Sequence, residues 1–309
     1  MKSLQKGVEE YLALRCGLGF KLDKNKVILR KFVSYLKQKR ASHITIKDSL
    51  SFAKQCRTRP SHWGTRLGII RRFALYWRAT DPRTEMPPLG LFPTKHDRAK
   101  PYIYSRKEIS SIVQEALRLS SQLGLRSKTY STLFALLAVT GMRISEVIAL
   151  DDEDVDLNHE ILNVRLTKFG KTRWVPIHRT TTDALKAYQR HRNRTVNRRK
   201  STAFFVSENG ARVTQWGIRY NFVLVSERVG LRKVTDSRGP RIHDMRHAFA
   251  VATLIRWYRQ GLNVDEEIPL LSTFLGHAHP TDTYWYLSAA PELLGLAASR
   301  LEKQLGGGK

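Results

Sequence analysis

Apolar residues recur three and four positions apart through the first third of the chain, with lysine or arginine between them. This spacing is typical of amphipathic helices, which bury one face. It predicts four helices, over residues 8–14, 27–36, 48–54 and 67–77.

Residues 87–101 interrupt this pattern with four prolines, and a proline cannot sit inside a helix without breaking a backbone hydrogen bond. We therefore expect a helical domain over residues 1–96, a linker at 97–101 and a second domain over 102–309.

The second domain combines helical spacing with a short stretch of alternating residues. Alternation predicts two strands, 162–166 and 173–177, around a turn at 168–171. The predicted fold class is therefore mainly α, with a small antiparallel β-sheet. Helices are expected at 106–123, at 128–139 before a break at 140–141, from 144 onward, and at 182–192, 214–229, 243–260 and 268–274.

The net charge of +27 over 309 residues is the strongest signal in the composition. Self-repulsion on this scale disfavours a compact chain, so a polyanionic partner is expected. Nucleic acid fits best, because neutralising its phosphates releases counterions. A membrane surface or the ribosome is the alternative.

The first 100 residues hold more than half of the charge excess, with 23 Lys and Arg against 7 Asp and Glu. Arg66, Arg71 and Arg72 flank apolar helix positions there, and we expect them to bind DNA, although a solvated helix surface explains any one of them equally well. Lys171 and Arg173, on the predicted hairpin, are further candidates for DNA contacts.

Two cysteines, 40 positions apart, fit neither a disulfide scaffold nor a zinc site. The first residues lack the apolar core of a signal peptide, and no apolar run approaches the length of a membrane span. A cytoplasmic protein without a membrane partner is expected.

Four segments place chemically active residues among core-like ones: TGMRISE at 140–146, TKFGKTR at 167–173, HDMRH at 243–247 and LGH at 275–277. Arg143 and Arg246 are residues that could grip the oxygens of one phosphate. For each arginine a structural ion pair, such as Arg143 with Glu146, is the alternative.

The histidines raise the question of a metal. His243 and His247 have the spacing of a helical zinc site, but Arg246 on the same face would repel a divalent cation. No carboxylate cluster is placed for magnesium, so we expect no metal and no cofactor. His277 could equally be a core or capping residue.

Lys168 and Tyr286 complete the set of candidates. A lysine on a turn can deliver a proton, although most turn lysines are simply solvated. A phenol is a poor nucleophile at neutral pH unless nearby cations favour its ionised form. By itself Tyr286 would be interpreted as a core residue.

Together these residues resemble the tyrosine recombinase (phage integrase) family, over the region from about residue 101 to the C-terminus and in the family's order. The resemblance implies a two-domain, C-shaped clamp on DNA, with a helical core-binding domain before an α+β catalytic domain. Residues 1–96 resemble the core-binding domain more loosely, through helical pattern and charge.

The resemblance also implies a metal-free reaction in which Tyr286 attacks a DNA phosphate and forms a 3′-phosphotyrosyl link. Arg143 and Arg246 would clamp the phosphate, His277 would donate a hydrogen bond, and Lys168 would be the general acid. His243 would assist proton transfer, with Glu146 and His247 in support.

Family members act as tetramers on two duplexes that carry specific recombination sites, and accessory DNA-bending or partner recombinase proteins are further candidate partners of this chain. The helix expected at 292–305 would dock on a neighbouring protomer. An insertion at 261–268 and the basic charge favour a mobile-element enzyme that integrates, excises or transposes DNA. A type IB topoisomerase and a non-catalytic basic DNA-binding protein are the alternatives.

Overall fold

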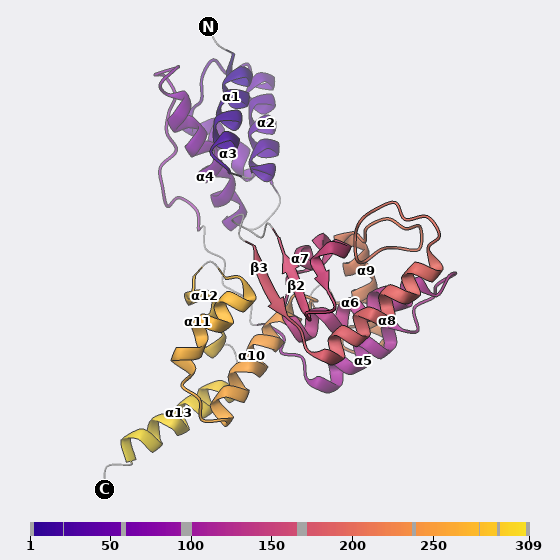
Figure 1. Cartoon of the computed structure of the whole chain (residues 1–309). Helices are drawn as coiled ribbons and strands as arrows, with labels where there is room; N and C mark the ends of the chain where they lie inside the picture. The colour runs from indigo at the N-terminus through magenta and orange to yellow at the C-terminus, as the bar shows by residue number, and fades with distance from the viewer. Residues whose placement is uncertain are drawn as a thin grey trace. The chain divides into compact units, whose positions relative to one another are not determined.

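The computed structural model describes residues 3–20, 22–56, 60–93, 101–165, 172–236, 239–277, 279–288 and 291–306. The chain divides into two compact units, residues 1–99 and 100–309, which Figure 1 colours from indigo to yellow. Most of the predicted linker, residues 97–100, lies outside the described residues.

Unit 1 is helical, as predicted. It contains α1 (Leu4–Gly17), α2 (Asp23–Gln38), α3 (Ile46–Lys54) and α4 (Pro60–Trp77), and each of the four predicted ranges lies inside one of them. In α4 the apolar positions Leu67, Ile70, Phe73 and Trp77 are buried, which confirms the amphipathic pattern.

Unit 2 combines helices with a three-stranded antiparallel sheet, which confirms the predicted fold class. The strands are β1 (Val155–Asp156), β2 (Ile161–Val164) and β3 (Arg173–Pro176), in that order. Leu162 pairs with Val155 on one side and with Val175 on the other. The first strand was not predicted, and the turn predicted at 168–171 lies outside the described residues.

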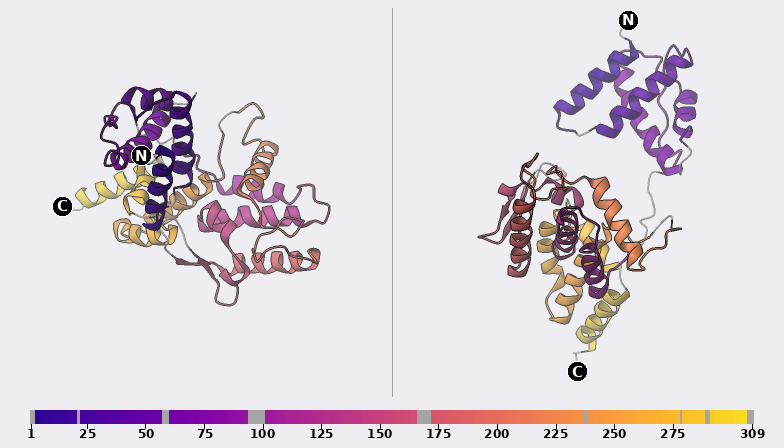
Figure 2. Two further views of the ribbon diagram at one scale, coloured as in Figure 1. Left: turned by 90° about the horizontal axis from the view of Figure 1, so that it is seen from above. Right: turned by 90° about the vertical axis from the view of Figure 1, so that its right-hand side faces the viewer.

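The helices of unit 2 fall into two groups. The long buried helix α6 packs against α5, α8 and α10, while α10 to α13 gather away from α8 in Figure 1 and in the left view of Figure 2. The bounds are α5 (Arg106–Ala116), α6 (Leu125–Thr140), α7 (Ile144–Ala149), α8 (Arg179–Thr195), α9 (Gln215–Arg228), α10 (Asp244–Arg259), α11 (Val264–Leu275), α12 (Thr281–Tyr284) and α13 (Pro291–Gly306), with 3₁₀ turns η1 (Asp152–Asp154) and η2 (Trp285–Ser288).

Two predicted helix bounds in unit 2 differ from the structure by four residues or more. Helix α5 ends at Ala116 rather than at 123, and beyond it the backbone N–H of Leu123 and the hydroxyl of Ser121 donate to the distant Glu208 carboxylate. Helix α11 begins at Val264 rather than at 268, so most of the expected insertion is the first turn of a helix.

A separate hydrophobic cluster holds α10, α11 and η2 together. It includes Leu254, Ile268, Leu271, Tyr286 and Leu293, each less than 5% exposed. Tyr286 is therefore fixed by core packing between these elements. In the described part of the chain, no helix is long and apolar enough to cross a membrane.

Candidate active site

Arg143 immediately precedes α7, and Glu146 closes the first turn of that helix. The Glu146 carboxylate, 6% exposed, accepts hydrogen bonds from the backbone N–H of Arg143 at 2.9 Å and from its Nη1 at 2.7 Å. A glutamate at the third helical position commonly caps a helix start in this way. The ion pair expected as an alternative is therefore present, and it fixes the direction of the Arg143 side chain.

Arg173, at the start of β3, bonds the same carboxylate. Its Nη1 and Nη2 lie 3.1 and 2.8 Å from the Glu146 oxygens, and its Nε donates to the carbonyl of Phe274 at 2.9 Å. Burial by itself would raise the pKa of Glu146, but the hydrogen bonds and charge of Arg173, with those of Arg143, lower it to about 2. With its side chain only 10% exposed, Arg173 is placed unfavourably for the DNA contact predicted for it.

Arg246 lies in the first turn of α10 and is 3% exposed. Its Nη1 donates to the carbonyl of Gly141 at 2.7 Å and its Nη2 to that of Leu275 at 2.8 Å. Burial, followed by the charge of Arg143, lowers the pKa of Arg246 to about 10, so it remains a cation at neutral pH.

The helix break predicted at Gly141 is present, and it lets the Arg246 side chain reach the carbonyl of Gly141. Gly141 has a φ of 60°, and a Cβ atom there would lie 2.7 Å from the ring of Phe249. Only glycine tolerates both the left-handed backbone and this contact.

His277 follows Gly276, which caps the end of α11 in the left-handed conformation with a φ of 68°. The Nδ1 atom of His277 lies 2.7 Å from the hydroxyl of Thr283, a completely buried residue of α12. Burial, then the charges of Arg246 and Arg143, lowers the pKa of His277 to about 4. Thr283 was not predicted, because no periodic pattern marks its contact with His277, which lies six positions earlier.

His243 and His247 lie one helical turn apart at the start of α10, with ring centroids separated by 5.1 Å. The ring of His247 also lies 5.4 Å from that of Tyr286. Burial, then the charge of His243, lowers the pKa of His247 to about 4. Within the described ranges, no three His, Cys, Asp or Glu side chains gather as a metal site would require.

Tyr286, in η2, is 2% exposed, whereas Tyr284 is 41% exposed. The Tyr286 ring lies nearly parallel to that of His277, with centroids 6.0 Å apart. Burial raises the pKa of Tyr286, and the charge and hydrogen bond of Arg246 offset this only in part. The phenol is therefore protonated at neutral pH and lies beside a permanent cation.

The structure thus brings most of the predicted catalytic residues into one site formed by α7, α10, the end of α11 and η2. Lys168 and Lys171 lie outside the described residues. The residues that gather are Arg143, Glu146, His243, Arg246, His247, His277 and Tyr286.

The three arginines predicted to bind DNA from unit 1 differ in exposure. The Arg66 guanidinium lies over the ring of Phe52, 4.3 Å from its centroid, and Arg71 donates to the carbonyl of Pro87. Arg72 is exposed. Their contact with DNA stays a prediction.

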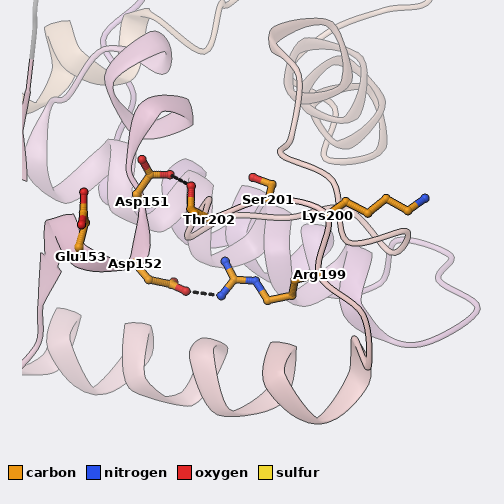
Figure 3. Close-up of a pocket in the computed structure, with 7 residues that line it drawn as sticks. All are labelled: Asp151, Asp152, Glu153, Arg199, Lys200, Ser201 and Thr202. Atoms are coloured by element: carbon orange, nitrogen blue, oxygen red, sulfur yellow. Dashed lines mark hydrogen bonds and ion pairs between the residues drawn. The ribbon is translucent and has the colours of Figure 1, made fainter.

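A hollow elsewhere in unit 2 is lined by charged residues that bond one another (Figure 3). Asp152 accepts hydrogen bonds from Arg199 and Arg192, and Asp151 accepts one from Thr202. These contacts join the start of the sheet to the segment after α8. The hollow is lined by none of the predicted catalytic residues.

Comparison with known proteins identifies the family. The model of the phage integrase family matches residues 104–292. The chain belongs to this family. It is 43% identical, over 98% of each chain, to a Sinorhizobium fredii protein named as an integrase/recombinase, and 29% identical to the tyrosine recombinase XerC of Herpetosiphon aurantiacus, over 89% of this chain and 87% of the relative. The chain is thus a site-specific DNA recombinase, which confirms the prediction from the sequence.

Solved structures of recombinases share the fold. The Tn1549 transposon integrase, in complex with transposon right end DNA, matches with a TM-score of 0.67 at 16% identity, over 98% of this chain and 99% of that one. The XerH site-specific recombinase, bound to its palindromic difH substrate, matches with a TM-score of 0.66 at 17% identity, over 91% and 80%.

Proposed function

We propose that Tyr286 is the nucleophile of a strand-exchange reaction at this site. Its phenolic oxygen loses a proton and attacks a DNA phosphorus atom, the bond from phosphorus to the 5′ oxygen breaks, and the leaving oxygen takes up a proton. The products are a 3′-phosphotyrosyl link and a free 5′-hydroxyl. Attack by a 5′-hydroxyl from a second duplex reverses these steps and joins the exchanged strands.

One observation carries this proposal: the Tyr286 hydroxyl is the nucleophilic group that shares a buried site with two arginines. Burial raises its pKa, and the charge and hydrogen bond of Arg246, followed by the charge of Arg143, offset part of that rise. Both guanidinium groups are held by backbone carbonyls, of Gly141, Leu275 and Gly276. Donors fixed in this way before the reaction stabilise charge that develops on a phosphate.

The histidines are proposed to move or share protons in their neutral form. With a pKa of about 4, His277 is uncharged at neutral pH. If the Thr283 hydroxyl donates to Nδ1, the ring proton lies on Nε2, from which it can bond a phosphate oxygen. His243 is proposed to assist proton transfer and Lys168 to protonate the leaving oxygen.

The partner we propose is double-stranded DNA carrying specific sites, bound by four protomers on two duplexes. The charge of +27 supports a polyanionic partner. Helix α13 is the proposed contact between protomers: near its start Leu293 is buried, whereas Leu294 is 55% exposed and available to another surface. The likeness to a transposon integrase supports a role in moving a mobile element.

The test is a covalent adduct with nicked DNA. Duplexes tiled across the DNA that flanks the gene, each with a nick beside the cleavage position, would trap the protein after cleavage because the short strand diffuses away. We expect an adduct that survives denaturation with the wild type and with Tyr284→Phe, the matched control, but not with Tyr286→Phe.

Two results would contradict the proposal. An adduct that persists in Tyr286→Phe would assign the nucleophile to another residue. Relaxation of supercoiled plasmids, without strand exchange between paired sites, would favour the topoisomerase alternative.

A further inference from the structure

The last carbonyls of α11 are bound by three arginines from three different elements. Arg173 Nε donates to the carbonyl of Phe274 at 2.9 Å, Arg246 Nη2 to that of Leu275 at 2.8 Å, and Arg143 Nη2 to that of Gly276 at 2.9 Å. A helix leaves its final carbonyls without partners inside the helix, and its C-terminus favours positive charge. The next residue in the chain is His277.

Arg173 is the member of this trio for which the proposed reaction gives no role. Besides Phe274 it binds both oxygens of Glu146, and Glu146 in turn holds the backbone and the guanidinium of Arg143. One side chain therefore ties the start of α7 to the end of α11.

We infer that Arg173 is a positioning residue for the recombination reaction, which holds Glu146 and the end of α11 together so that Arg143 and His277 keep a fixed separation at the phosphate. This inference rests on the proposed function. Arg173 itself does not touch the reacting atoms.

The packing around Gly276 supports this role independently. A Cβ atom on Gly276 would lie 2.6 Å from Nη1 of Arg173 and 2.9 Å from its Cζ, so the guanidinium passes directly against the helix end. The side chain is 10% exposed, and its Nε, Nη1 and Nη2 all make bonds within the protein. Lysine, with a single ammonium group, cannot reproduce this three-way geometry.

The test compares Arg173→Gln and Arg173→Lys with Arg118→Gln in the full-length protein. Arg118 is a suitable control, because it is 78% exposed, pairs only with Glu115 among the contacts described, and its loss changes the net charge equally. DNA affinity at several salt concentrations and the rate of the first cleavage on saturating nicked DNA are measured separately, together with the thermal midpoint of each variant.

We expect Arg173→Gln to bind DNA like the control but to cleave bound DNA about 10²-fold more slowly, because a misplacement of about 1 Å at a reacting centre can cost that much. Arg173→Lys should recover part of the cleavage rate. If Arg173→Gln does not fold, the cleavage rate of Arg173→Lys tests the inference. In a Glu146→Gln background the same substitution should cost less than about tenfold, because residues of one network are not additive.

Three results would overturn the inference. In the first, the Arg173 variants bind DNA more weakly, with a salt dependence reduced by about one phosphate contact, but cleave bound DNA at the normal rate. That result would make Arg173 a DNA contact. The second is full additivity with Glu146→Gln, and the third is normal cleavage by both Arg173 variants. Absence of an adduct with the wild type would instead refute the proposed function.

Discussion

Replacing Glu146 by glutamine should destabilise unit 2 by about 3 kcal/mol at pH 7. The pKa of Glu146 is about 2 against an ordinary value of 4.5, so its surroundings favour the ionised form by roughly 2.5 pKa units, each worth about 1.4 kcal/mol. Glutamine keeps the shape but loses the charge, leaving Arg143 and Arg173 close together without their bonded anion. Breaking a buried ion pair on one side typically costs about 3–5 kcal/mol, in the same range.

The sign of the pH dependence follows from the lowered pKa. Since the folded protein holds Glu146 ionised more strongly than the unfolded chain does, its stabilisation is complete above pH 4.5 and is lost as the pH falls towards 2. The difference between wild type and Glu146→Gln should therefore be constant from pH 7 to 5 and shrink below that.

The assay is urea unfolding of the full chain, followed by circular dichroism, with hydrogen exchange to locate the loss. Glu292→Gln is the matched control, because Glu292 pairs with Arg259 at 2.8 Å but is 52% exposed, and exposed pairs contribute less than about 1 kcal/mol. Faster exchange should appear in α7 and at the end of α11. A loss below about 1 kcal/mol in Glu146→Gln, equal to that of the control, would refute the view that this carboxylate anchors the site.

Two further predictions concern the phosphate clamp. Arg143→Ala should lower the rate of adduct formation by about 10²–10³-fold while gel-shift affinity changes little, since one preorganised donor to a developing charge is lost; cleavage at the wild-type rate would rule out the clamp. The ring of His277 should titrate with a pKa of about 4 when followed by NMR in the free protein, because burial and then the charges of Arg246 and Arg143 oppose its protonation. A pKa at or above 6.5 would show that the ring is hydrated and apart from these charges.

The sequence predicted the helices and strands that have a regular spacing of apolar residues, and the site residues that belong to an ordered motif. The helices of unit 1 and the strands on either side of the hairpin follow from spacing, and Arg143, Arg246 and Tyr286 follow from a family motif. The short strand at Val155–Asp156 has too few residues to show alternation, so it escaped notice.

The spacing of residues along the chain could not predict which groups Arg173 contacts. On a basic hairpin it looks like a DNA contact, yet its partners are 27 and 101 positions away along the chain. Long-range pairing of this kind becomes visible only when β3 lies against the end of α11. The contact between Thr283 and His277 spans only six positions, but it depends on how α12 follows α11, which no periodic pattern predicts.

The electrostatics of the assembled site explain why these distant contacts matter. Arg143 and Arg173 share one bonded carboxylate, and the pKa of Arg246 is lowered by burial and by the charge of Arg143. The protein holds these like charges together with helix-end carbonyls, which fix the guanidinium groups but carry only partial negative charge. A phosphodiester bound as proposed would add a second full negative charge, besides that of Glu146, and would relieve part of the repulsion between Arg143 and Arg246. We infer that folding brings these cations together before DNA binds. The guanidinium donors are then already in position to stabilise the transition state.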